Sequence, residues 1–187
     1  MPFGRLAACV PLLSLLASCT TTIRPPVAVN DPARVLVLTH GISSSLVLPD
    51  ERGGGVRFAY GDWRYYALGQ TGLCETLAAV LWPTRAALGR QVIEPAMIER
   101  LSHEVAVAIV VDRKAVDGLR ARLEAIFFQA IDSWVYNPGH RLEFVTHPQP
   151  YSLRNNSNRQ VARWLRELGA EVSGVPLLPK WIEAPAR

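Results

Sequence analysis

The chain has 187 residues, of which 49% are hydrophobic and 19% are charged, a balance typical of a folded domain and too apolar for a disordered chain. Its formal net charge is +4, and the 20 cationic side chains, 18 of them arginines, are spread along the sequence without a dense cluster. This spread argues against a nucleic-acid-binding surface, which gathers its cations in one run or on one face. We therefore expect one globular domain and no nucleic-acid partner.

The first residues are typical of an export signal. Arg5 precedes an apolar run from Leu6 to Leu16, and Leu16-Ala17-Ser18-Cys19 closes the segment with small residues. The run is too short to span a bilayer as a helix, which takes about 20 residues. The closing quartet resembles the bacterial lipobox, in which the signal is cut before a cysteine that becomes lipidated. The alternative is an ordinary cleavable signal with an incidental cysteine.

We expect residues 1–18 to be a signal peptide and Cys19 to carry a lipid, so that the membrane is a partner through this anchor. This places the protein in the bacterial cell envelope, facing the periplasm, and Thr20 after the cysteine favours the outer membrane by analogy with other lipoproteins. Residues 19–33 contain adjacent prolines and no periodicity, which predicts an extended tether before a single globular domain at 34–187. Because Cys9 leaves with the signal and Cys19 is lipidated, Cys74 has no partner for an intramolecular disulfide.

In the first half of the domain the pattern predicts strands followed by a helix. The apolar run Val35–Thr39 and the piece Ser45–Leu48 predict two strands, and the alternation in Val56–Tyr60 predicts a return strand. Gly53-Gly54-Gly55 is interpreted as a hairpin loop rather than a phosphate cradle, since no Lys-Ser/Thr pair or helix start follows it. Thr71 is placed to cap a helix with apolar residues at Leu73, Leu77, Val80 and Leu81. This predicted helix ends at Trp82, before Pro83.

The second half predicts a strand, a helix, a strand and a helix. Apolar residues alternate strictly at Val105, Val107, Ile109 and Val111, which predicts a strand within Leu101–Val111. Asp112 is placed to cap a helix that continues to Phe127. Leu142–Val145 predicts a short strand, and Ser157–Leu168 predicts a helix whose C-terminal cap is Gly169. The expected fold class is α+β, with an antiparallel sheet flanked by helices.

Few chemical motifs are present. The segment that ends in Thr39-His40-Gly41 is similar to the oxyanion loop of α/β-hydrolases, but the Gly-x-Ser-x-Gly elbow of that fold is absent. The four histidines do not lie at metal-ligand spacing, so we expect no metal, and no motif indicates a cofactor.

Two segments together resemble a known family. The first is His40–Pro49 followed by Phe58–Tyr66, the second is Asn155–Ala162, and Leu81-Trp82-Pro83-Thr84 lies between them. Their order is similar to a bacterial lipoprotein family, domain-of-unknown-function family 2459. That family in turn resembles circularly permuted NlpC-type papain-like hydrolases such as lecithin retinol acyltransferase. The resemblance implies a permuted papain-like architecture, with a catalytic histidine on an early strand and a catalytic cysteine at the start of a late helix.

The chain departs from this pattern at both catalytic positions. Alignment with the family's strand motif puts Ser43 where the histidine belongs, and alignment of the late helix puts Ser157 where the cysteine belongs. The candidate catalytic residues are therefore Ser157 as nucleophile, His40 as base and Asp62 as orienting acid. The candidate binding residues are Ser43, Asn156 and Asn158.

A serine nucleophile needs a positioned base, because its hydroxyl does not ionise by itself. On one regular strand residues 40 and 43 point to opposite faces, so His40 takes over the role of position 43 only if Gly41 marks a bulge. Otherwise Ser157 is a helix N-cap, and Asp62 a turn former. Two functions follow: a catalytically degenerate domain that binds an envelope ligand or partner, or a serine-variant amidase, esterase or acyltransferase.

Overall fold

The computed structural model describes residues 20–70, 82–101 and 105–185. The helices in these ranges are α3 (Pro95–Leu101), α4 (Arg113–Gln129) and α5 (Ser157–Glu167), with a π-helical turn at Trp63–Ala67 and a 3-10 turn at Ile131–Ser133. The strands are β1 (Thr21–Arg24), β2 (Pro32–His40), β3 (Ser43–Pro49), β4 (Gly55–Asp62), β5 (Thr84–Ile93), β6 (Val105–Asp112), β7 (Val135–Asn137), β8 (Leu142–Tyr151), β9 (Glu171–Gly174) and β10 (Trp181–Glu183). No helix within these ranges is long and apolar enough to cross a bilayer.

The strands form two sheets. The large sheet has seven strands in the order β6-β2-β3-β4-β5-β8-β7, and every neighbouring pair is antiparallel. The small sheet has the order β10-β1-β9, with β10 parallel and β9 antiparallel to β1. The expected α+β class with an antiparallel sheet flanked by helices is confirmed. The strands at Val35 and Ile109 share the large sheet, since these two residues are paired.

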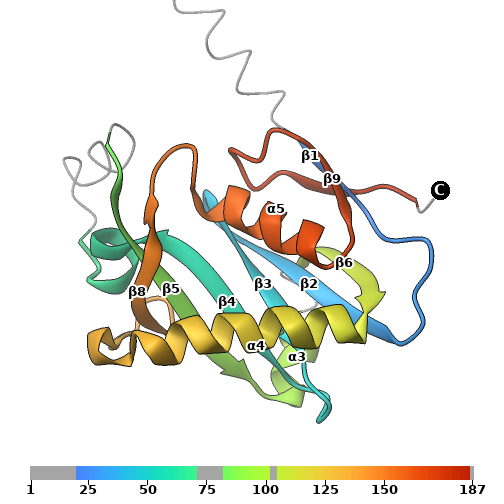
Figure 1. Ribbon diagram of the computed structural model, residues 1–187, viewed down its shortest axis with the longest axis horizontal. Coiled ribbons are helices and arrows are strands. Elements are labelled where there is room, and N and C mark those ends of the chain that lie inside the picture. The colour runs from blue at the N-terminus through green and yellow to red at the C-terminus, as the bar shows by residue number, and fades with distance from the viewer. Residues whose placement is uncertain (1–19, 71–81, 102–104, 186–187) are drawn as a thin grey trace, which may run out of the picture.

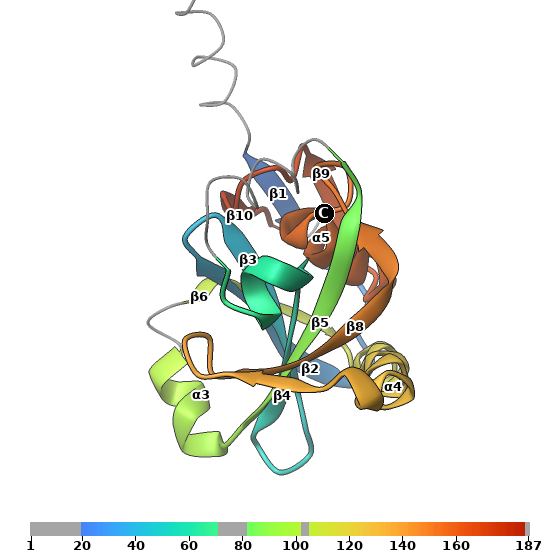
Figure 2. The same ribbon diagram turned by 90° about the vertical axis from the view of Figure 1, so that its left-hand side faces the viewer.

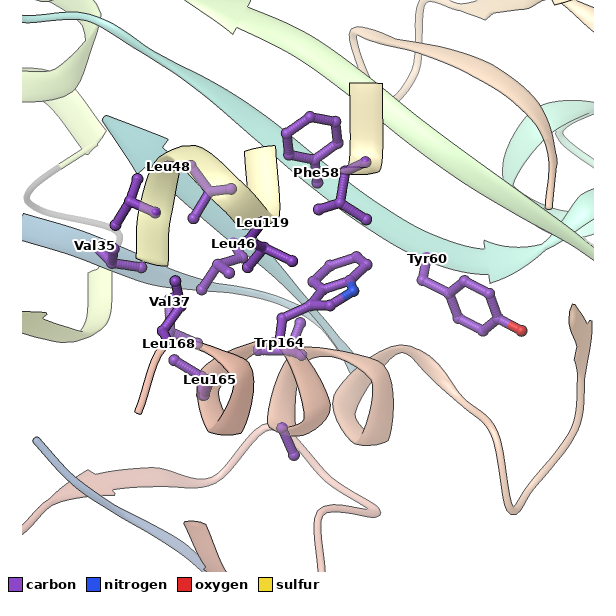
Figure 3. Packing of buried hydrophobic residues seen from close by; sticks show 14 of the residues in the cluster. Val35, Val37, Leu46, Leu48, Phe58, Tyr60, Leu119, Trp164, Leu165 and Leu168 are labelled. Atoms are coloured by element: carbon purple, nitrogen blue, oxygen red, sulfur yellow. The ribbon is translucent and has the colours of Figure 1, made fainter. Parts of the chain in front are cut away.

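The two faces of the large sheet bury different clusters, because side chains alternate along each strand. One face packs against α4, α5 and the small sheet, where Trp164 of α5 and Leu119 of α4 approach Leu46 of β3 (Figure 3). The other face carries two smaller apolar clusters, one packed against Leu101 of α3 and one against Trp63 of the π-helical turn. α3 and α4 accordingly lie on opposite sides of the sheet (Figure 2).

The two long predicted helices are confirmed, and their ends follow from local chemistry. Asp112 is extended and its carboxylate accepts a hydrogen bond from the Lys114 amide, which caps α4. α5 ends before Gly169, which has a φ of +86°, a conformation that glycine adopts without a Cβ penalty. α5 buries Val161, Trp164 and Leu165 against the sheet, as its spacing predicts.

Two predictions at the edges of these elements are wrong. Thr20 to Ala33 is not a tether throughout, because Thr21–Arg24 forms the central strand of the small sheet and Ile23 is fully buried (Figure 1). The partners of this strand follow about 150 residues later, so no local pattern reveals it. Leu101 is the last residue of α3 rather than part of the next strand. The predicted helix from Thr71 lies outside the described residues, except for Trp82.

Candidate functional site

The segment from His40 to Ser43 is a tight hairpin between two strands. Gly41 has a φ of +59°, which suits the first central position of a two-residue type II′ turn. His40 and Ser43 are paired across the hairpin, and paired residues share a face of the sheet. The expectation that residues 40 and 43 point to opposite faces of one strand is wrong, because Gly41 turns the chain into a second strand instead of adding a bulge to the first.

The His40 ring belongs to a polar cluster on the face covered by α3. Its Nε2 atom lies 3.1 Å from Ser45 Oγ and 2.9 Å from Nη2 of Arg57. Arg57 also donates from Nε to Ser45 Oγ at 2.9 Å and from Nη1 to Gln91 Oε1 at 3.3 Å. Ser45 is fully buried. The histidine therefore has a serine partner, but one that no substrate can reach.

The same surroundings make His40 a weak base. Burial, the Arg57 guanidinium and His140 together lower its pKa from 6.5 to about 4. A neutral ring at physiological pH accepts hydrogen bonds at Nε2 from the two donors that already contact it. A general base works best when its pKa lies near the operating pH, and the pKa of His40 lies well below physiological pH.

Ser157 lies in a different pocket, at the start of α5. Asn156, and not Ser157, is the N-cap: its side-chain oxygen accepts a hydrogen bond from the Arg159 amide at 2.9 Å. Ser157 is the first helical residue, and its hydroxyl has no hydrogen-bond partner among the described residues. It faces a pocket of about 160 Å³ lined by Ile42, Tyr66, Tyr151, Leu153, Asn156, Ser157, Asn158, Leu177 and Leu178, a set without a histidine or a carboxylate.

Asn158 is a structural residue in this arrangement. Its Oδ1 accepts from Ser44 Oγ at 2.7 Å, and its Nδ2 donates to the carbonyls of Ile42 at 3.0 Å and Leu177 at 2.9 Å. Ser44 in turn accepts from Trp181 Nε1 at 2.8 Å. Because Ser44 and Ser45 are consecutive strand residues, they point to opposite faces, and α5 with Ser157 lies on the Ser44 side. α5 therefore packs on the face opposite to the one that carries the His40 ring, and His40 is not among the described residues that line the Ser157 pocket.

The other two candidate residues also serve the fold. The Asp62 carboxylate accepts hydrogen bonds from the Tyr65 amide at 2.9 Å and from the Thr84 hydroxyl, and so caps the π-helical turn. Ser43 donates to the carbonyl of His40 at 3.0 Å, across the hairpin. Within the described part of the chain, neither side chain hydrogen-bonds to Ser157 or to the His40 ring.

His40 also lines a polar hollow, which we call the basic pocket. Its volume is about 480 Å³, and it is lined by His40, Arg57, Gln91, Met97, Arg100, Leu101, Gly139, His140 and Arg141. Three of these residues are arginines, and none is acidic. Arg100 and Arg141 form no ion pair among the described residues, and Arg141 has a φ of +54°, which a non-glycine residue adopts at a cost of about 1–2 kcal/mol. Strained backbone of this kind is concentrated at functional sites.

The sequence did not reveal the basic pocket, because its residues come from β2, β4, β5, α3 and the turn between β7 and β8. One signal was available. Arg57 stands between Val56 and Phe58, so it points away from the main core, and a charged side chain on a central strand needs a polar partner there. That partner proves to be His40, 17 residues earlier.

The lowered pKa of His40 predicts acid-dependent stability. Between pH 6.5 and about pH 4 the unfolded chain binds a proton that folded His40 does not, so the free energy of unfolding falls as the pH falls through this window. Because the ring is partly exposed, we expect a loss of about 1–2 kcal/mol. Urea unfolding at about pH 7 and about pH 4.5 measures it.

His40→Gln is the matched control for this experiment. Burial also lowers the pKa values of His140 and His147, so some acid sensitivity persists in the variant. We expect the variant to lose less stability between the two pH values than the natural chain. Equal losses would contradict the assignment of the acid-sensitive step to His40.

Comparisons with protein-family models, curated proteins and solved structures give no match to this chain.

Proposed function

We propose that this chain is a lipid-anchored protein of the bacterial cell envelope whose domain binds a small multivalent anion in the basic pocket and does not catalyse a reaction. The observation that carries the proposal is the lining of that pocket, whose described residues include three arginines and no acidic residue. The ligand class is a small molecule with phosphate or carboxylate groups.

The charges of the basic pocket support an anion. Guanidinium groups form bidentate, charge-assisted hydrogen bonds with phosphate and carboxylate oxygens. Arg100 and Arg141 line one hollow and form no ion pair among the described residues, so a bound anion would relieve the repulsion between them. A volume of about 480 Å³ lies within the usual range of small-molecule sites. The amide of Gln91 and the neutral ring of His140 add hydrogen-bonding groups without charge.

The described surroundings of Ser157 support binding rather than hydrolysis. Among the described residues, the Ser157 pocket contains no histidine, while the His40 ring lies on the face opposite to α5 and has a lowered pKa. The relation to permuted NlpC-type hydrolases stays a proposal, and a contact supports it: Asn158, at the start of α5, donates to the Ile42 carbonyl beside His40. In this proposal the inherited catalytic site is disabled.

Titration calorimetry with pyrophosphate and with citrate tests the proposed function, with glucose as an uncharged control. We expect binding of at least one anion and no binding of glucose. Arg100→Gln combined with Arg141→Gln should weaken binding at least about tenfold, because each removes a charged hydrogen-bond donor. Both side chains are exposed, so the double variant should fold.

The matched control is Arg52→Gln combined with Arg154→Gln, which changes the net charge equally at exposed positions outside the basic pocket. We expect it, and Ser157→Ala, to bind as the natural chain does. No binding of either anion, or an equal loss in the control, would overturn the basic pocket as the site. Labelling by a serine-directed phosphonate that disappears in Ser157→Ala would instead favour the serine-variant hydrolase or acyltransferase.

A further inference from the structure

We infer that the arginines of α5 form a surface that binds the phosphate groups of anionic phospholipids and holds the domain against the bilayer in one orientation. The inference rests on the proposed lipid at Cys19, but the arginine surface can be tested separately from that lipid.

The predicted anchor leads directly into the folded domain. Thr21 pairs with Gly174 of β9, and its amide donates to the carbonyl of Lys180 at 2.8 Å. A Cβ at Gly174 would collide with the carbonyl oxygen of Thr20, so these two backbone segments are in close contact. One residue spans less than about 4 Å. A lipid on Cys19 therefore keeps this corner of the small sheet at the membrane surface.

Three arginines lie beside this corner, on one face of α5. Arg159, Arg163 and Arg166 are spaced by four and three residues, and with Gly174, Val175 and Pro176 they line a hollow of about 200 Å³. We call these six residues the arginine surface. Gly174 belongs both to this surface and to the pairing with Thr21. The two features are thus one continuous region, with α5 next to β1 and β9 (Figure 1).

Within the described ranges, no acidic residue forms an ion pair with the three arginines of the arginine surface. Arg163 bonds to uncharged Asn155 and Gln160, and Arg166 bonds to the Val172 carbonyl. The Nε atom of Arg159 is buried without a hydrogen-bond partner among the described residues. The two neighbouring acids are already paired elsewhere, Glu167 with Arg122 and Glu171 with Arg24.

The surroundings of the arginine surface also suit a bilayer. Val175 is 48% exposed, and Ile182, which pairs with Thr22 on the small sheet, is 54% exposed. Exposed aliphatic side chains beside cations are the combination that amphipathic surfaces use at the headgroup boundary. α3, which lines the basic pocket, lies on the opposite side of the large sheet from α4 and α5 (Figure 2). This orientation leaves the α3 side turned away from the membrane.

Hydrogen exchange on the purified full-length product tests the inference. The protein is placed in nanodiscs of phosphatidylcholine alone or with phosphatidylglycerol, and exchange is followed by mass spectrometry at residues 159–166 and 172–176. We expect about fivefold slower exchange, or more, in the anionic nanodiscs, since one arginine contributes about a fivefold factor near an anionic surface. Arg159→Gln, Arg163→Gln and Arg166→Gln together should abolish the difference.

The matched control removes Arg34, Arg52 and Arg64, which are exposed and outside the arginine surface, and it should keep the difference. If the triple α5 variant does not fold, Arg163→Gln with Arg166→Gln replaces it, because both side chains are exposed. Equal exchange in the two nanodiscs, or an equal response of both triple variants, would overturn the inference. Slowing by inorganic phosphate in phosphatidylcholine nanodiscs would also overturn it, in favour of a soluble ligand.

Intact mass separates this inference from the proposed anchor. A lipid mass that is present in the natural protein and absent in Cys19→Ser supports the anchor. An unmodified natural protein would refute the anchor. In that case the unmodified protein is mixed with vesicles of the same two lipid compositions, and slower exchange with phosphatidylglycerol would still support binding by the arginine surface.

Discussion

Replacing Trp164 by alanine is expected to lower the free energy of unfolding by about 3–5 kcal/mol, the range for a large aromatic side chain deleted from a core. Trp164 is fully buried, and its indole points from α5 toward Leu46 and Leu119 (Figure 3). Since α5 joins the large sheet to both α4 and the small sheet, the cavity would lie where three parts of the core meet. Urea unfolding at neutral pH measures the loss.

Two further tryptophan variants show whether burial is the cause. Trp164→Phe should cost less, about 1–2 kcal/mol, because it keeps an aromatic ring and removes an indole N–H that is buried without a partner among the described residues. Trp82 is 67% exposed, so Trp82→Ala should change stability by no more than about 0.5 kcal/mol. Equal losses in Trp164→Ala and Trp82→Ala would contradict this account of the core.

Asn158→Ala is expected to lower the free energy of unfolding by about 2–4 kcal/mol. The variant leaves the Ser44 hydroxyl and the carbonyls of Ile42 and Leu177 without their partners, and each unsatisfied buried group costs about 1–3 kcal/mol before the site relaxes. The chain of hydrogen bonds from Trp181 through Ser44 to Asn158 ties β10, β3 and α5 together. Thermal and urea unfolding measure the effect.

Ser157→Ala, one residue earlier in the same helical turn, is the matched control. Its hydroxyl has no partner within the described ranges, so we expect a change within about 0.5 kcal/mol. Anion binding by Asn158→Ala, measured below its melting temperature, should equal that of the natural chain, because Asn158 is outside the basic pocket. A stable Asn158→Ala variant that loses anion binding would instead make Asn158 a binding residue.

The proposed site and the proposed membrane contact use the two sides of the large sheet differently. α5 carries the arginine surface on one side, and α3 carries part of the basic pocket on the other. Both depend on arginines that are far apart in the sequence, which has a net charge of +4 and no cationic run. The cations become clusters only when the strands and helices bring them together.

Several elements could be predicted because short-range patterns specify them. The alternation of Val107, Ile109 and Val111 fits one buried face of a strand, and the position of Asp112 fits the cap of the helix that follows. The three glycines after Asp50 lead into the return strand of a hairpin, whose turn is closed by the Asp50 amide and the Gly54 carbonyl at 3.0 Å. In each case the sequence signal that specifies the element lies within a few residues of it, although the strand that pairs with β6 is β2, far earlier in the chain.

β5 shows the opposite case, because it is a central strand with a poor strand sequence. Thr84–Ile93 contains adjacent alanines and Gly89, which weaken a strand prediction. A Cβ at Gly89 would lie 2.6 Å from Cε1 of Phe144, so the ring of the neighbouring strand occupies the place of a side chain. Only the pairing of β5 with β4 and β8 explains these small residues.

The amino-acid sequence by itself determined β2, β3, β4, β6, α4 and α5, together with the α+β class. Apolar periodicity and capping residues specify such elements through residues that are close in the sequence. Only the tertiary structure shows that β1 belongs to the domain, and that the His40 ring and α5 lie on opposite faces of one sheet. The placement of the His40 ring depends on the two-residue turn at Gly41, because a shift of one residue moves every later side chain of a strand to the other face. Contacts between distant segments, which assemble the basic pocket and the arginine surface, have no signature in local sequence.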